Sequence, residues 1–237
     1  MSAISSAFKN DDLRKKILFS LAMVILYRIG AQIPTPGVDY GGIQAQINSL
    51  TDSSAMYSLI NLFSGGALLK LSVFAVGIMP YITASIIVQL LTVVIPKFEQ
   101  LKKEGQSGQA KMTEYTRYLT VALALLQSAG IVALADRKQL LGQGVPVLKE
   151  DTGIFGLIVM VMVMTSGAVL LMWMGELITD RGIGNGMSLL IFAGIATALP
   201  GQGASILASS GGFVFAGVVV GVLILVVGVV SVSYTHL

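Results

Sequence analysis

The fold of this chain is decided by residues 71–95, which read LSVFAVGIMPYITASIIVQLLTVVI and carry no charged side chain. A helix that crosses a bilayer needs about 20 apolar residues, so this stretch is long enough to span a membrane. A shorter apolar piece, residues 57–69, comes before it; this piece is interrupted at Ser64-Gly65-Gly66 and followed by Lys70. We expect the shorter piece to be a re-entrant half-helix. Irregular backbone at membrane depth survives only inside protein or beside a water-filled cavity, so the combination predicts a pore or a binding site.

The composition also predicts a membrane protein. Apolar residues make up 54% of the 237 positions and charged residues only 11%, whereas soluble domains carry about 25% charged residues. We therefore expect an all-α, polytopic membrane protein. Six segments can span the bilayer: residues 16–33, 71–95, 118–135, 153–175, 187–199, and 212 onward.

The basic residues predict the orientation of the chain. Ten of the 15 lysines and arginines fall in the N-terminus, the connection 97–117 and Arg181. Cytoplasmic loops are enriched in basic residues, so we expect a cytoplasmic N-terminus and a half-helix that enters from outside. These loops also account for the net charge of +3, and no DNA binding is implied. Arg28 is the one charge well inside a span, and we expect it to snorkel or pair in the outer half of the membrane.

The sequence shows no catalytic constellation, and its acidic residues lie mostly in predicted loops. The chain has no cysteine and a single histidine, His236, so no histidine triad or paired histidine metal site can form. Residues 181–186 (RGIGNG) resemble a phosphate-binding glycine loop, but that fingerprint needs a strand before it and a helix after it. We interpret them as a flexible turn before the fifth helix. The sequence predicts no enzyme activity, no cofactor and no metal.

Several contiguous runs carry a family resemblance. Residues 63–68 and 76–91 resemble the plug and second helix of the SecY family, the channel subunit of the bacterial Sec translocon. Residues 172–186 resemble a second family signature, and residues 102–105 and 115–118 resemble the first large cytoplasmic loop. The runs have the family's order and spacing and extend over residues 12–230. The variant is similar to actinobacterial members.

The resemblance implies a bundle of ten helices in two inverted halves, located in the bacterial plasma membrane. Residues 1–200 would hold helices one to five, with the plug at 57–72. Residues 201–230 would hold an outer loop and a truncated helix six. Residues 231–237 resemble a translated sequencing adapter, and we expect them to be a non-native tail on a gene fragment.

The resemblance also implies a function: a protein-conducting channel that moves unfolded secretory polypeptides across the membrane and releases membrane segments sideways into lipid. The residues implied are the pore ring (Ile78, Ile82, Met187, Ile191), the plug (Asn61, Leu62, Phe63, Ser64, Gly65, Gly66, Ala67, Leu68), the lateral gate (Thr83, Gln127) and a cytoplasmic partner loop (Lys102, Lys103, Lys111, Arg117). Thr83 and Gln127 could equally be ordinary contacts between helices, and each lysine could be a topological anchor.

The implied partners are SecE, SecG, the SecA motor, the ribosome, signal sequences, nascent polypeptides and membrane lipids. Two other classes of protein stay open. One is a small-solute or ion transporter, which would usually place an ionisable residue at the membrane midplane, where only Arg28 comes near. The other is a non-conducting scaffold or an insertase-like protein, which needs no apolar constriction.

Overall fold

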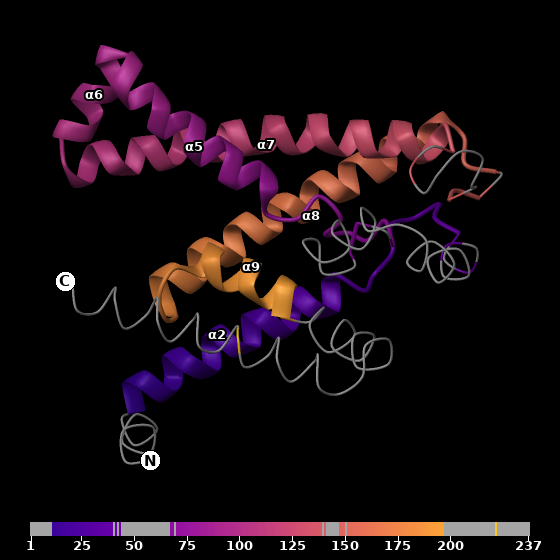
Figure 1. The fold of residues 1–237 in the computed structure, drawn as a ribbon, viewed down its shortest axis with the longest axis horizontal. Coiled ribbons are helices and arrows are strands. Elements are labelled where there is room, and N and C mark those ends of the chain that lie inside the picture. The colour runs from indigo at the N-terminus through magenta and orange to yellow at the C-terminus, as the bar shows by residue number, and fades with distance from the viewer. Residues whose placement is uncertain are drawn as a thin grey trace. The chain divides into compact units, whose positions relative to one another are not determined.

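The structure is a computed structural model that describes residues 11–39, 41, 43, 67–68, 70–138, 140, 147–149, 151–196 and 221. Its regular elements are α2 (Asp11–Gly30), α5 (Met79–Val94), α6 (Pro96–Lys103), α7 (Gln106–Asp136), α8 (Ile154–Arg181) and α9 (Gly186–Ala196) (Figure 1). The predicted all-α fold class is confirmed for this part of the chain. The chain divides into two compact units, Met1–Ile195 and Ala196–Leu237. Apart from Ala196 and Gly221, the second unit lies outside the described residues.

Within the described residues, two helices are long and apolar enough to cross a membrane, namely α7 with 31 residues and α8 with 28. Helices α5 and α6 would form a third span if taken together, although they are bent by 100° at their junction. α7 contains the predicted span 118–135, and α8 contains all of the predicted span 153–175 except its first residue, Gly153. At a rise of about 1.5 Å per residue, the 20 residues of α2 extend about 30 Å, close to the thickness of the hydrocarbon core. The molecule is a multi-pass membrane protein.

The connection 97–117, predicted as a loop, is a helical hairpin. α6 ends at Lys103 and α7 begins at Gln106, well before the expected start at residue 118. Leu101 and Met112 are both 8% exposed and pack together with Val88 of α5. The basic residues of this segment indicated a loop, but its apolar residues recur at helical spacing and bury a small core, which favours helix.

The predicted span 71–95 becomes helical only at Met79, so the sequence overestimated the length of this helix. Residues 71–78 form turns. The backbone is left-handed at Leu71 and Gly77, with φ of 45° and 64°, and Pro80 lies in the first turn of α5. Proline is well placed to begin a helix and poorly placed to continue one. Apolarity alone could not distinguish these buried turns from a helix.

Protein surrounds these turns. Thr35 donates two hydrogen bonds to the carbonyl of Leu71, from its backbone nitrogen at 3.0 Å and its hydroxyl at 2.8 Å. The backbone nitrogen of Val73 donates to the carbonyl of Ile33 at 2.9 Å. On the opposite side, a Cβ added to Gly167 of α8 would lie 2.0 Å from the carbonyl oxygen of Val73, so the two backbones touch. This enclosure is the condition under which irregular backbone persists at membrane depth.

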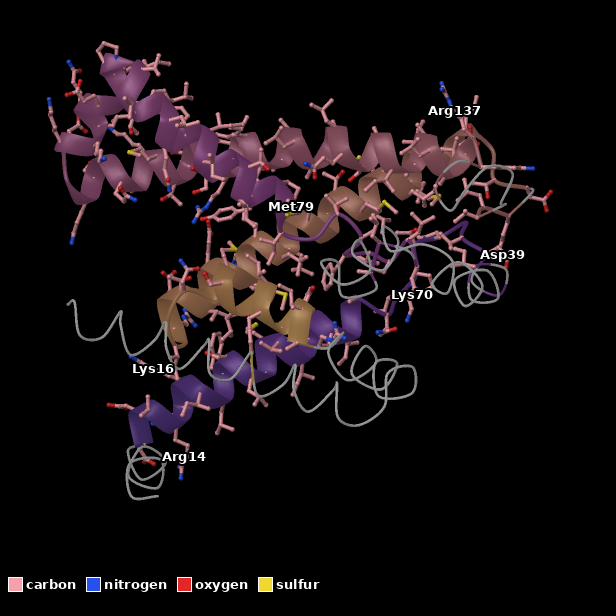
Figure 2. The ribbon with its side chains drawn as sticks, in the orientation of Figure 1. Arg14, Lys16, Asp39, Lys70, Met79 and Arg137 are labelled. Atoms are coloured by element: carbon pink, nitrogen blue, oxygen red, sulfur yellow. The ribbon has the colours of Figure 1, made fainter. Side chains whose placement is uncertain are left out.

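Basic residues from both predicted sides of the membrane lie near α2, at opposite ends of the helix. Figure 2 shows Arg14 and Lys16 at the N-terminal end of the helix and Lys70 near the other end. Lys70 Nζ donates a 2.8 Å hydrogen bond to Oε1 of Gln32, just beyond the last residue of α2. This is the separation that the positive-inside prediction requires. Which end faces the cytoplasm stays a prediction.

Arg28 lies in the last turn of α2. Its Nη1 atom is buried and has no hydrogen-bond partner within the described part of the chain. Arg28 is expected to snorkel or pair, and this nitrogen has no pairing partner among these residues.

Candidate functional site

The structure brings the four predicted ring residues into one apolar cluster. Ile78 directly precedes α5 and Ile82 lies in its first turn, whereas Met187 and Ile191 belong to α9. Ile78 and Met187 are each 8% exposed and belong to the buried core of the cluster, and Ile82 and Ile191 pack against it. The spacing of four residues places Met187 and Ile191 on one face of α9. Two segments far apart in the sequence thus meet at these side chains.

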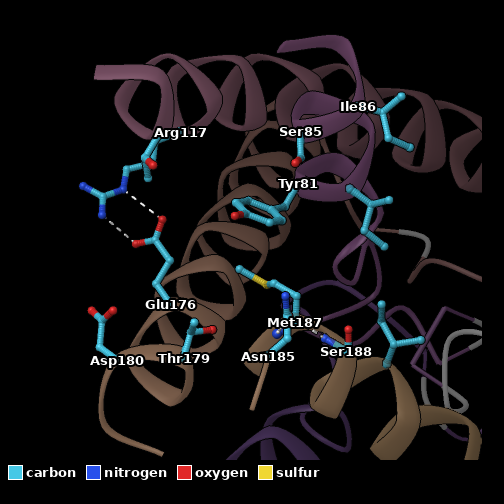
Figure 3. A pocket seen from close by; sticks show the side chains of 13 residues that line it. Tyr81, Ser85, Ile86, Arg117, Glu176, Thr179, Asp180, Asn185, Met187 and Ser188 are labelled. Atoms are coloured by element: carbon cyan, nitrogen blue, oxygen red, sulfur yellow. Dashed lines mark hydrogen bonds and ion pairs between the residues drawn. The ribbon is translucent and has the colours of Figure 1, made fainter. Parts of the chain in front are cut away.

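A cavity of about 500 Å³ borders three of these four residues, Ile82, Met187 and Ile191. The rest of its wall is mostly polar (Figure 3) and comprises Tyr81, Ser85, Ile86, Thr113, Arg117, Glu176, Thr179, Asp180, Asn185 and Ser188. The cavity therefore joins a polar wall to the apolar cluster that contains the predicted ring.

An ion pair crosses the polar wall of the cavity. Arg117 of α7 donates from Nε and Nη2 to the two carboxylate oxygens of Glu176 of α8, at 2.9 and 2.8 Å (Figure 3). Such bidentate geometry gives strong, directional hydrogen bonds. The Glu176 side chain is only 17% exposed, whereas Arg117 is 51% exposed. Arg117, which the sequence grouped with the partner loop, is held against α8 in this structure.

The glycine-rich turn between α8 and α9 is held by side chains. Asn185 Oδ1 accepts hydrogen bonds from the backbone nitrogens of Met187 at 3.0 Å and Ser188 at 3.2 Å, which caps the N-terminus of α9. Gly184 has a left-handed φ of 69°, a conformation that favours glycine. The structure has a turn between α8 and α9, as the sequence predicted. Capping of α9 explains why the glycine-rich run contains Asn185, without a phosphate site.

Only the end of the predicted plug can be placed, because residues 61–66 lie outside the described residues. Ala67 is 1% exposed and belongs to the same cluster as Ile78 and Met187. Leu68 packs against a second cluster that includes Leu71. The described end of the predicted plug thus adjoins the predicted ring.

The two predicted gate residues lie on neighbouring helices, Thr83 on α5 and Gln127 on α7, and both are partly exposed. The Thr83 hydroxyl donates to the carbonyl of Met79 in its own helix at 3.0 Å. In the described part of the chain no hydrogen bond joins Thr83 to Gln127. A polar contact between α7 and α8 that the sequence did not indicate is made by Thr165 Oγ1, which donates to Ser128 Oγ at 3.2 Å.

The lysines of the predicted partner loop lie on the α6–α7 hairpin. Lys103 pairs with Glu99 at 2.6 Å and Lys111 with Glu104 at 3.8 Å, and all four side chains are about half exposed or more. Lys102 is exposed. Exposed pairs contribute only about 0–1 kcal/mol each, so these lysines can exchange their partners easily.

These features define a class of protein: a multi-pass helical membrane protein in which a broken helix, buried turns and a capped helix end meet at an apolar cluster beside a polar cavity. The model of the SecY family matches residues 72–236, and the chain belongs to the SecY family.

Curated relatives agree with this assignment. The protein translocase subunit SecY of Corynebacterium glutamicum is 73% identical over 234 residues, which cover 98% of this chain and 53% of the relative. The Mycobacterium tuberculosis protein is 63% identical over 236 residues, with the same two coverages. The Streptomyces coelicolor protein is 56% identical over 206 residues, covering 84% of this chain and 46% of the relative. The predicted actinobacterial resemblance is confirmed, and the chain spans about half the length of the curated relatives it matches.

Two solved structures share the fold. One is described as the structure of a protein conducting channel and gives a TM-score of 0.50; the other, the channel of a canine ribosome-channel complex from the endoplasmic reticulum, gives 0.51. Each is 16% identical and covers 84% of this chain and 38% of the other chain.

Proposed function

We propose that this chain forms the N-terminal half of a protein-conducting channel, which moves unfolded secretory polypeptides across the bacterial plasma membrane and releases membrane segments sideways into lipid. One observation carries the proposal: Ile78, Ile82, Met187 and Ile191 converge on one apolar cluster, and the last three border a cavity with a polar wall. Family membership supports it. A small-solute or ion transporter, which the sequence left open, has no support from the family or from the fold.

The ring would seal the closed channel by excluding water. A constriction lined with apolar side chains dewets, so ions meet a dry barrier, whereas the side chains of a polypeptide can fill the opening. Met187 can seal with a flexible thioether, which adapts to irregular gaps. The position of Ala67 beside Ile78 and Met187 supports a plug that packs against the ring. In this proposal residues 57–72 form that plug, and the second half of the channel completes the ring.

Lateral release would separate α5 and α7 from helices of the second half. Thr83 and Gln127 would offer polar contacts at that seam. Interhelical hydrogen bonds in membranes contribute only about 0.6 kcal/mol on average, so a signal sequence that supplies apolar contacts can displace them. Thr83 bonds to its own helix at Met79, which leaves its hydroxyl oxygen able to accept a hydrogen bond from a partner.

The cytoplasmic partners would bind the α6–α7 hairpin. Lys102, Lys103 and Lys111 are exposed on it, and a partner rich in negative charge, such as the ribosome or an acidic surface of SecA, fits this arrangement. Arg117 is paired with Glu176 and is a weaker candidate for this contact. SecE and SecG would complete the complex. The N-terminus would be cytoplasmic, with Arg14 and Lys16 on the side of the hairpin.

Ion leak through a completed channel tests the proposal. The completed chain joins residues 1–230 to the remaining part of the Corynebacterium glutamicum relative, and is reconstituted into vesicles with its partner subunits. Serine at Ile78, Ile82 and Ile191 together should wet the constriction and raise the resting ion leak. The matched control places serine at Ile25, Ile154 and Ile158, which are 49%, 80% and 56% exposed on helix surfaces. A leak at the level of the unmodified channel in the first variant would refute the ring assignment.

A further inference from the structure

The N-terminus of α9 touches α8 backbone to backbone. A Cβ added to Gly186 would lie 2.0 Å from the carbonyl oxygen of Gly175 and 2.7 Å from the Cβ of Ile178. Real Cβ atoms do not approach backbone oxygen so closely, so the first residue of α9 can be only glycine in this arrangement. The start of α9 is therefore fixed against one turn of α8, at Gly175.

A single hydroxyl joins the two glycines. Thr179 Oγ1 donates to the carbonyl of Gly175 at 2.9 Å and accepts from the backbone nitrogen of Gly186 at 2.9 Å. The first of these bonds is the ordinary bond of a helical threonine to its preceding turn. The second is not local to a helix, because it crosses to α9. Together with the Asn185 cap on Met187, it fixes both the position and the direction of the first turn of α9.

The side chain of Met187 occupies the space that Gly175 leaves open. A Cβ added to Gly175 would lie 2.3 Å from the Met187 sulfur and 2.7 Å from its terminal methyl carbon. The cluster that contains Met187 also contains the fully buried side chains of Leu171, Ile178 and Leu190. Because these buried side chains are close-packed, we expect a thioether displaced from Gly175 to move toward the cavity that Met187 borders.

We propose that the space left by the missing side chain of Gly175 holds the ring residue Met187 in place, and we call this space the Met187 seat. Thr179 and Gly186 are positioning residues that hold α9 against it. Methionine is flexible, with three rotatable bonds, and would seal a ring poorly unless something held it in place. The Met187 seat supplies that restraint, so the closed state of the channel depends on residues of α8 that do not themselves line the ring. This inference rests on the proposed channel function.

The test measures resting ion leak in the completed chain. Gly175→Ala should raise the leak about fivefold or more, because overpacking of this kind strongly disfavours the seated side chain. Adding Met187→Val should reverse most of this rise, relative to Met187→Val alone, because valine lacks the two atoms that would clash. The matched control is Gly130→Ala in α7, where an added Cβ meets nothing within 4 Å; it should leave the leak unchanged.

A second pair of variants tests the hydroxyl bridge. Thr179→Val removes the bond to Gly186 and should raise the leak, whereas Thr179→Ser keeps the hydroxyl and should not. If Gly175→Ala acted only by lowering the general stability of the protein, Met187→Val would suppress its effect no better than other substitutions would.

The serine variant at Ile78, Ile82 and Ile191 is measured beside these. If that variant leaks and Gly175→Ala does not, the seat is refuted and the channel proposal stands. If neither leaks, both are refuted. If Gly175→Ala does not accumulate in the membrane, recovery of the protein by Met187→Val supports the seat, and no recovery overturns it.

Discussion

The ion pair between Arg117 and Glu176 should stabilise the packing of α7 on α8. Removing Arg117 should lower the stability of the protein more than removing Glu176. Removing Arg117 leaves a carboxylate that is only 17% exposed without its partner, whereas removing Glu176 leaves a guanidinium that is 51% exposed and easily hydrated. Hydrogen bonds to charged groups contribute about 1.5–3 kcal/mol, and exposed pairs only about 0–1 kcal/mol.

The structure places this pair between those limits. We therefore expect Arg117→Gln to lower the free energy of unfolding by about 2 kcal/mol and Glu176→Gln by about 1 kcal/mol. The double variant should be more stable than the sum of the two changes implies, because the groups form one unit.

The assay is thermal unfolding of the completed chain in detergent, at low and high salt. High salt should weaken the contribution of the half-exposed Arg117. Equal losses for the two single variants would refute the argument from exposure. A double variant whose loss equals the sum of the single losses would refute the ion pair itself.

Two further predictions follow from the packing and the charges. Gly167→Ala should destabilise the protein by about 1–3 kcal/mol, because its Cβ would lie 2.0 Å from the carbonyl oxygen of Val73; thermal unfolding beside the Gly130→Ala control measures this, and equal stability of the two variants would contradict it. Glutamate at Lys102 and Lys103 should weaken binding of the ribosome or SecA, with a loss that shrinks as salt is raised; unchanged binding with an altered membrane orientation would show that these lysines are topological anchors.

Much of the helical framework could be predicted from the sequence because it depends on local properties. The length and apolarity of residues 118–135 and 153–175 were enough to find α7 and α8. The start of the second span could not be found this way, since residues 71–78 are as apolar as the helix that follows. The left-handed backbone at Leu71 and Gly77 turns this segment. Its backbone forms hydrogen bonds with Thr35 and Ile33, which are distant in sequence.

The site was less predictable. The ring residues could be predicted only from the family resemblance. The spacing of isoleucines in an apolar helix does not distinguish those that line a pore from those that pack against other helices. The pairing of Arg117 with Glu176 joins residues 59 positions apart, and only the packing of α7 on α8 brings them together. The bridge from Thr179 to Gly186 depends on the turn geometry between two helices. Its one local sign was the glycine-rich run itself.

Crosslinking during translocation can show whether a polypeptide passes through the ring. A photoreactive residue is placed at Ile78 or Ile191 of the completed chain, and a secretory chain is stalled during translocation. The control position is Phe192, which neighbours Ile191 on α9 but is 67% exposed and lies outside the apolar cluster. If the ring surrounds the translocating chain, positions 78 and 191 should crosslink to the stalled chain and position 192 should give little crosslinking. Equal crosslinking at Phe192, or none at the two ring positions, would contradict the ring assignment.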